Sequence, residues 1–173
     1  MKFKLILSSI IGAGLLSGCV ATNNVRQIDF NPSTLPYQMY DGYWAMLPEQ
    51  GVYNTIKFNT DGTAKLYRFQ CLSDTEYQEK AHEEYRLGSN SNNTVDMYPV
   101  KVGIGAWAGL VIDHFTVRVV AITDKGNMAK MTQLIPGKAA PLKFIYARLP
   151  SAKPLCSEPK LEQKVEKAQA KFQ

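Results

Sequence analysis

From about residue 40 onward, runs of β-branched and aromatic residues alternate with turn-forming residues. In GVYNTIKFNTDGTAKLYRFQC (51–71), the dipeptide Asp61-Gly62 separates two apolar-rich runs, which is a strong signal for a β-hairpin. A two-residue turn at this point predicts one buried face and one mostly polar face. The predicted buried face consists of Val52, Ile56, Phe58, Tyr67, Phe69 and Cys71. Leu66 falls on the polar face.

Later segments predict more strands of the same kind. TVDMYPV (94–100) is one strand, and FTVRVVAITDKGNMAKMTQLI (115–135) is a hairpin that turns at 124–127. The last strand, LKFIYARL (142–149), places Leu142, Phe144, Tyr146 and Arg148 on one side. About eight strands in one domain predict an all-β, antiparallel, up-and-down β-barrel, because closure removes the exposed sheet edges.

Two segments leave their local structure open. In 73–88, Ser73 and Glu76 are spaced as a helix capping box, and Gly88 would end the helix. The same residues also fit a strand, so we expect a loop or short helix followed by a strand from about Glu83. In 157–173, apolar residues recur near helical spacing, which predicts a short amphipathic helix. That helix either packs on the barrel near Cys156 or is a detachable partner helix, and the nearby cysteine favours packing.

The amino terminus has the layout of an export signal. Two lysines precede the apolar run LILSSIIGAGLLSG (5–18), which is shorter than the roughly 20 residues needed to span a bilayer. The run ends in Leu16-Ser17-Gly18-Cys19, which resembles the lipobox of bacterial lipoproteins. The resemblance implies cleavage before Cys19 and attachment of a diacylglycerol and an acyl chain to that residue, which is a stable membrane anchor. Val20 in the next position implies the outer membrane, on its periplasmic face or at the cell surface.

This processing divides the chain into four parts. Residues 1–18 are the signal peptide, 19–38 a flexible stalk rich in Asn, Thr, Ser and Pro, 39–150 the barrel, and 151–173 a C-terminal segment. Loss of the two lysines of the signal lowers the net charge from +5 to +3. So small a charge gives no reason to expect nucleic acid as a partner.

Acylation of Cys19 leaves Cys71 and Cys156. The space beyond the inner membrane is oxidising, so these two are predicted to form a disulfide. The alternatives are two free thiols or a metal pair, and the pair has no nearby His or Cys at ligand spacing.

Gly42-Tyr43-Trp44 at the start of the first strand is similar to the Gly-X-Trp motif of lipocalins. Arg148, near the end of the last strand, stands where lipocalin-like barrels place an arginine over that tryptophan. The resemblance implies that Trp44 and Arg148 close one end of the barrel by a cation–π contact. The second lipocalin motif, Thr-Asp-Tyr, is absent from the matching position, and the domain is short for a lipocalin.

The residues suggest no catalytic or metal site. The chain has two histidines, His82 and His114, and neither lies at ligand or catalytic spacing from suitable partners. The glycines Gly103, Gly105 and Gly109 lack the strand–turn–helix setting of a phosphate loop. We therefore expect no enzyme and no cofactor.

The segment VGIGAWAGLVI (102–112) is an apolar, small-residue run around Trp107. It either folds over one end of the barrel as a plug or forms a pliable lip in which Ile104, Trp107 and Leu110 contact a ligand.

Two functions follow from these patterns. The first is a lipid-anchored envelope protein that binds an apolar small molecule or another envelope protein. The second is a periplasmic inhibitor or immunity protein that blocks a lysozyme-like or toxic hydrolase, for which GSNSNN (88–93) is the candidate inhibitory loop.

Overall fold

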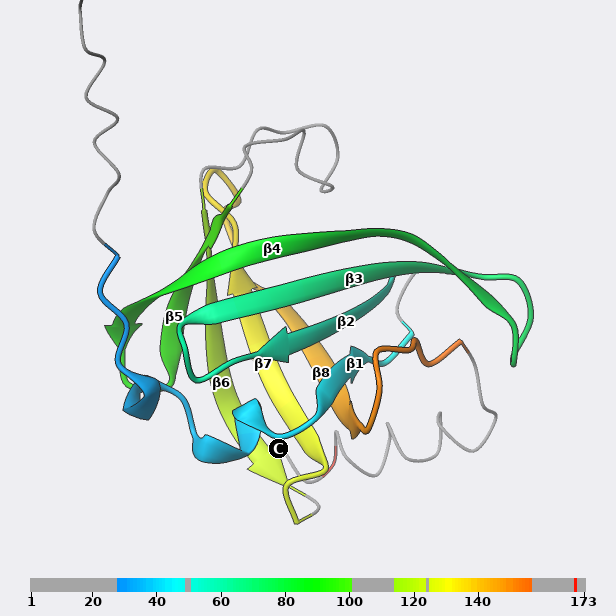
Figure 1. The fold of residues 1–173 in the computed structure, drawn as a ribbon, viewed down its shortest axis with the longest axis horizontal. Helices are drawn as coiled ribbons and strands as arrows, with labels where there is room; N and C mark the ends of the chain where they lie inside the picture. Colours follow the sequence, from blue (N-terminus) through cyan, green and yellow to red (C-terminus); the bar gives the residue numbers. More distant parts are fainter. Residues whose placement is uncertain (1–27, 49–50, 101–113, 124, 157–169, 171–173) are drawn as a thin grey trace, which may run out of the picture.

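In the computed structural model, which describes residues 28–48, 51–100, 114–123, 125–156 and 170, eight antiparallel strands close into a barrel. Each strand pairs with the next, and β8 returns to β1 (Figure 1). The predicted all-β, up-and-down barrel of eight strands is therefore confirmed. The strands are β1 (Tyr43–Met46), β2 (Tyr53–Phe58), β3 (Thr63–Cys71), β4 (Tyr77–Ser91), β5 (Thr94–Pro99), β6 (Phe115–Thr123), β7 (Met128–Leu134) and β8 (Leu142–Leu149).

The barrel has two different ends. Two short 3-10 helices, η1 (Pro32–Thr34) and η2 (Tyr37–Tyr40), precede β1, and Leu35 and Met39 from this segment enter the core. We call this end the helix end, and the turns β2–β3, β4–β5 and β6–β7 lie there (Figure 1). The opposite end, where β1, β3, β5 and β7 finish and β2, β4, β6 and β8 begin, is the loop end.

Alternation along each strand directs every second side chain into the barrel. These inward side chains form one apolar cluster, and its largest fully buried members are Trp44, Tyr146, Phe58, Met39, Met46, Ile56, Leu87, Met97 and Met131. The inward face predicted for β8 is confirmed, since Tyr146 is buried and Leu142 and Phe144 pack against the cluster. A continuous apolar interior thus supports the ring of strands.

The predicted hairpin forms, but its register is wrong by one residue. Ile56 faces Leu66 rather than Tyr67, and the Asn59 amide donates to the Thr63 carbonyl across a three-residue loop. Gly62 ends this loop with φ of +81°, a left-handed conformation that suits glycine. Because a one-residue slip moves each side chain of a strand to the other face, Leu66 lies in the core and Tyr67 lies outside.

The segment after β3 is also a correction, because it forms a hairpin rather than a loop or helix. Strand β4 begins at Tyr77, six residues before the predicted start. The Ser73 hydroxyl accepts hydrogen bonds from the Thr75 and Glu76 amides, as a helix cap would, but here it stabilises the tight turn in which the Leu72 amide donates to Glu76. Side-chain bonds of this kind serve turns as well as helix starts.

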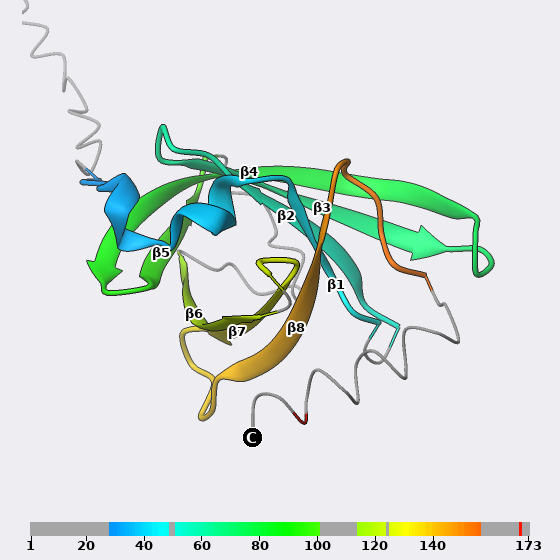
Figure 2. The same ribbon diagram turned by 90° about the horizontal axis from the view of Figure 1, so that it is seen from below.

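The β3–β4 hairpin projects from the barrel. Figure 2 shows it extending well past the ring of strands, and Figure 1 shows the same extension from the side. Among the described residues, β2 pairs with β3 as far as Phe69, and β5 pairs with β4 from Tyr85. We call residues 70–82 the ribbon; its β4 strand is exposed on both faces from Tyr77 to His82.

Residues 29–40 belong to the domain, although the sequence places most of them in the stalk. The Ser89 amide donates to the Asp29 carbonyl, and the Asn93 amide donates to the Thr34 carbonyl. These bonds join residues 29–34 to the end of β4 and the β4–β5 turn. The signal peptide, Cys19 and, apart from Ala170, the predicted C-terminal helix lie outside the described residues.

Candidate functional site

Trp44 and Arg148 lie together at the helix end. Trp44 is fully buried, and its indole Nε1–H donates to the Met39 carbonyl at 3.0 Å. Arg148 is its direct cross-strand partner on β8. The guanidinium of Arg148 binds the Asp41 carboxylate and, at 2.9 Å, the side-chain oxygen of Asn127. Arg148 thus joins the η2–β1 connection to the β6–β7 turn, while its cation–π contact with Trp44 stays a prediction.

Gly42 explains the glycine that precedes this tryptophan. Its φ is +76°, and a Cβ there would stand 2.7 Å from the Leu149 carbonyl oxygen and 3.1 Å from Cγ of Arg148. Any side chain would collide with backbone at the point where β8 meets the start of β1. The Gly-X-Trp motif therefore has a local packing reason.

The predicted disulfide is confirmed. Cys71 at the end of β3 and Cys156 are bonded, with Cα atoms 5.4 Å apart and a sequence separation of 85. The chain leading to Cys156 crosses the outside of the barrel, where the Thr55 hydroxyl donates to the Lys153 carbonyl at 2.7 Å. This crossing buries Thr55 completely although it faces outward. The disulfide holds the C-terminal segment to the outer part of the ribbon, because Cys71 and Tyr77 are the last residue pair before its turn.

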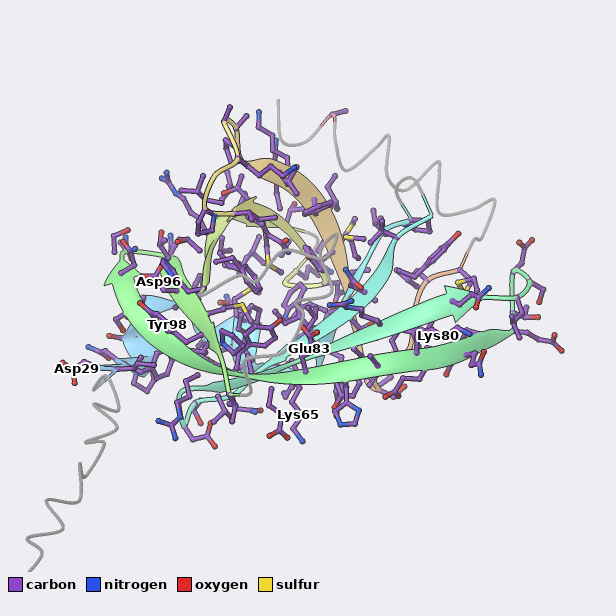
Figure 3. The ribbon with its side chains drawn as sticks, turned by 90° about the horizontal axis from the view of Figure 1, so that it is seen from above. Asp29, Lys65, Lys80, Glu83, Asp96 and Tyr98 are labelled. Carbon is purple, nitrogen blue, oxygen red and sulfur yellow. A yellow bond between two sulfur atoms is a disulfide. The ribbon has the colours of Figure 1, made fainter. Side chains whose placement is uncertain are left out.

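A charged network lies on the inner face toward the loop end. The Arg68 guanidinium lies 3.0 Å from Oε1 of Glu83, and the Tyr85 hydroxyl donates to the other carboxylate oxygen of Glu83. Burial, followed by the hydrogen bond to Glu83, raises the pKa of Tyr85 well above its ordinary value, so the phenol stays neutral. One cation and one anion therefore cancel. Figure 3 shows Glu83 near the barrel and Lys80 farther out on the ribbon.

Gln133 and Tyr146 form a neutral polar pair inside the barrel. Nε2 of Gln133 donates to the Tyr146 hydroxyl at 2.9 Å, and the two residues are 4% and 1% exposed. Oε1 of Gln133 is buried and has no hydrogen-bond partner among the described residues. Burial raises the pKa of Tyr146, so this phenol also stays protonated.

Apolar side chains surround these polar groups. The Tyr85 and Phe115 rings pack edge to face at 5.4 Å, and the Phe144 and Tyr146 rings do so at 6.4 Å. Val117, the cross-strand partner of Gln133, is buried. The interior toward the loop end is thus an apolar surface with a few polar atoms, the composition typical of small-molecule sites.

The histidines lie apart. His82 is on the exposed ribbon with Nδ1 3.0 Å from a Glu79 oxygen, and the His114 ring stacks on Tyr98 at 5.2 Å. Within the described residues, no group of three or more His, Cys, Asp or Glu could hold a metal ion. No helix in that same part of the chain is long and apolar enough to cross a membrane.

Several predicted site residues lie outside the described residues, namely Cys19, Ile104, Trp107 and Leu110. The structure adds polar inward residues that the sequence patterns did not single out, namely Arg68, Glu83, Tyr85 and Gln133, and it pairs Gln133 with Tyr146. For Gln133 a signal existed, because it follows Ala129 and Met131 at every second position of a strand. Arg68 falls on the polar face in the predicted hairpin, because the predicted register was wrong by one residue.

Among solved structures, the chain is similar to two complexes of bovine odorant binding protein. One holds a selenium-containing odorant and is 13% identical, with 84% of this chain and 86% of that chain covered. The other holds its natural ligand and is 12% identical, with 84% and 88% covered. The TM-score is 0.39 in both cases. No family model matches the chain, and no curated protein matches it.

Proposed function

We propose that the mature protein is a lipid-anchored, non-enzymatic protein of the bacterial outer membrane whose barrel binds a small apolar molecule through the loop end. The observation that carries the proposal is the inner face of the barrel, which is mostly apolar and carries the buried neutral pair Gln133 and Tyr146 toward that end. An eight-stranded barrel has an interior of the size that holds side chains or one small ligand.

The path of the chain supports this orientation. Asp29 and Asn31 are bonded to Ser89 at the helix end, through the Ser89 amide and hydroxyl. A linker of eight residues, 20–27, reaches at most about 25–30 Å. An anchor at Cys19 therefore holds the helix end toward the membrane and leaves the loop end free to receive a ligand.

Fluorescence titration of the mature protein with N-phenyl-1-naphthylamine, an apolar dye, tests the binding. We expect saturable binding at one site. Two neighbouring variants on β6 locate it: Val117→Phe fills the interior, whereas Arg118→Phe adds the same ring on the exposed face. Only the inward variant should weaken binding, by about tenfold or more, with circular dichroism confirming that both fold. Absence of saturable binding, or equal loss in both variants, contradicts the proposal.

The anchor is tested separately. Labelled palmitate should enter the wild-type protein, and a Cys19→Ser variant should lose the label and leave the membrane fraction. An unlabelled wild-type protein that retains Met1 would contradict lipid attachment without bearing on the binding site.

One observation favours the alternative function, an inhibitor of a lysozyme-like or toxic hydrolase. The ribbon stands clear of the barrel, with Leu72 61% and Tyr77 44% exposed, and a disulfide at Cys71 braces it next to its turn. The candidate loop 88–93 is less suited, because the Ser89 hydroxyl is already bonded to the Asn31 amide and to Thr34. If lysozyme activity falls in the presence of the protein, and Tyr77→Ala abolishes the effect, the inhibitor function replaces the binding function.

A further inference from the structure

The buried pair Gln133 and Tyr146 has hydrogen-bonding capacity that the described residues do not use. Oε1 of Gln133 is a buried acceptor without a partner among them. The Tyr146 hydroxyl accepts a hydrogen bond from Gln133, and no described residue accepts the proton of this hydroxyl. Buried polar atoms of native proteins almost always have a partner. An unused acceptor beside an unused donor inside an apolar barrel therefore indicates a bound group that completes them.

We propose that Gln133 and Tyr146 are the polar anchor of the ligand site, and that the ligand is an uncharged amphiphile with one hydroxyl or primary amide group on an apolar body. The inference rests on the proposed function and specifies its ligand class. A hydroxyl can donate to Oε1 of Gln133 and accept from the Tyr146 phenol at the same time.

Either orientation of the Gln133 amide leaves hydrogen-bonding capacity unused. If Oε1 and Nε2 of Gln133 exchange places, the Tyr146 hydroxyl donates to Oε1. The two protons of Nε2 then no longer bond to Tyr146. The pair then offers donors and the remaining lone pairs of its oxygens. In either arrangement a group that both donates and accepts fits best.

The charge of the surroundings excludes a carboxylate as the preferred head group. Gln133 and Tyr146 are neutral, and the inward cation Arg68 is already bound to Glu83. A carboxylate moved from water to this position would lose its hydration without gaining a counter-charge. A neutral head group loses less on entry.

Competition against N-phenyl-1-naphthylamine tests the inference with three probes of similar length: 1-undecanol, decyl methyl ether and undecanoate at pH 8. The alcohol both donates and accepts, the ether only accepts, and the acid is ionised. For the wild-type protein we expect the alcohol to bind about tenfold more tightly than the ether and more than tenfold more tightly than the acid.

Two variants and one control complete the design. Gln133→Leu and Tyr146→Phe remove the polar atoms with little change of shape, and the ratio of alcohol to ether affinity should fall to about one in each. Met131→Leu, at the adjacent inward position, keeps the polar pair and should keep the ratio. If a variant binds the dye as the wild type does, the fold and the apolar site are intact.

The outcomes separate the two proposals. A wild-type protein that binds the dye but shows equal affinity for alcohol and ether, or a ratio that persists in Gln133→Leu, overturns the polar anchor and leaves the apolar site standing. Preference for undecanoate overturns the neutral ligand class. A wild-type protein that does not bind the dye overturns the proposed function and this inference with it.

Discussion

The two ends of the barrel differ in how completely their own side chains satisfy the hydrogen-bonding groups. At the helix end, Trp44 is capped by the Met39 carbonyl, and Arg148 is bonded to both Asp41 and Asn127. Toward the loop end, a buried glutamine oxygen lacks a partner among the described residues. The contrast shows that the two ends of a single ring of strands can differ in how completely their buried polar groups are hydrogen-bonded.

The largest expected effect concerns the link between the C-terminal segment and the loop end. Replacing Cys71 and Cys156 together by Ser opens a loop of 85 residues and should lower the free energy of unfolding by about 4–5 kcal/mol in the chain-entropy model. Urea unfolding under oxidising conditions measures it. If reduction and the double variant both leave the midpoint unchanged, the segment is held by other contacts.

The same substitution at both ends tests the contrast directly. Leu87 is fully buried near the helix end, whereas Leu142 is half-buried at the loop end. Leu87→Ala should cost about 3 kcal/mol, within the range for core leucines. Leu142→Ala should cost about 1 kcal/mol because less surface is returned to water. Equal losses in urea unfolding would show that both ends are equally packed.

Removing the polar pair should stabilise the empty protein. Gln133→Leu with Tyr146→Phe replaces both partners by apolar groups of similar shape, a change that can be neutral or stabilising. We expect a gain of about 1 kcal/mol in thermal or urea unfolding, together with loss of alcohol selectivity. If the double variant instead loses more than about 2 kcal/mol of unfolding free energy, the pair stabilises the fold and is not kept for a ligand.

The smallest effect concerns a turn at the helix end. The Asp61 carboxylate accepts hydrogen bonds from the hydroxyl and the amide of Thr63, which lower its pKa below the ordinary value. A folded-state pKa below the unfolded one contributes stability above the unfolded pKa of about 3.9, and this is lost as the pH falls through the folded pKa. Asp61→Asn should lower the urea midpoint slightly at pH 7, and the difference between the two proteins should shrink as the pH falls below about 4. A constant difference would exclude this carboxylate as the cause.

Local pattern predicted most of the architecture, and long-range geometry decided the rest. The alternation in 142–149 correctly placed Tyr146 inside, and the count of strands predicted the closed barrel. The face of Tyr67 depended on one more residue in the turn before it, which Asp61-Gly62 does not specify.

The ribbon and the polar anchor needed more than local pattern. Residues 77–82 form a strand because they pair with the end of β3, although both faces are exposed and no amphipathic alternation marks them. The meeting of Gln133 and Tyr146 depends on the pairing of β7 with β8, which the sequence pattern does not supply. Both features therefore required the folded structure.

The central claim is that a small apolar molecule binds inside the barrel toward the loop end. Methyl resonances of ¹³C-methionine, recorded while the mature protein is titrated with N-phenyl-1-naphthylamine, test it most directly. Met46, Met97 and Met131 face the interior, Met39 lies beneath Trp44 at the helix end, and Met128 alternates with the inward Ala129. We predict shifts at the first three with Met39 and Met128 unchanged; shifts confined to Met128, or no shift at any interior methyl, would contradict the claim.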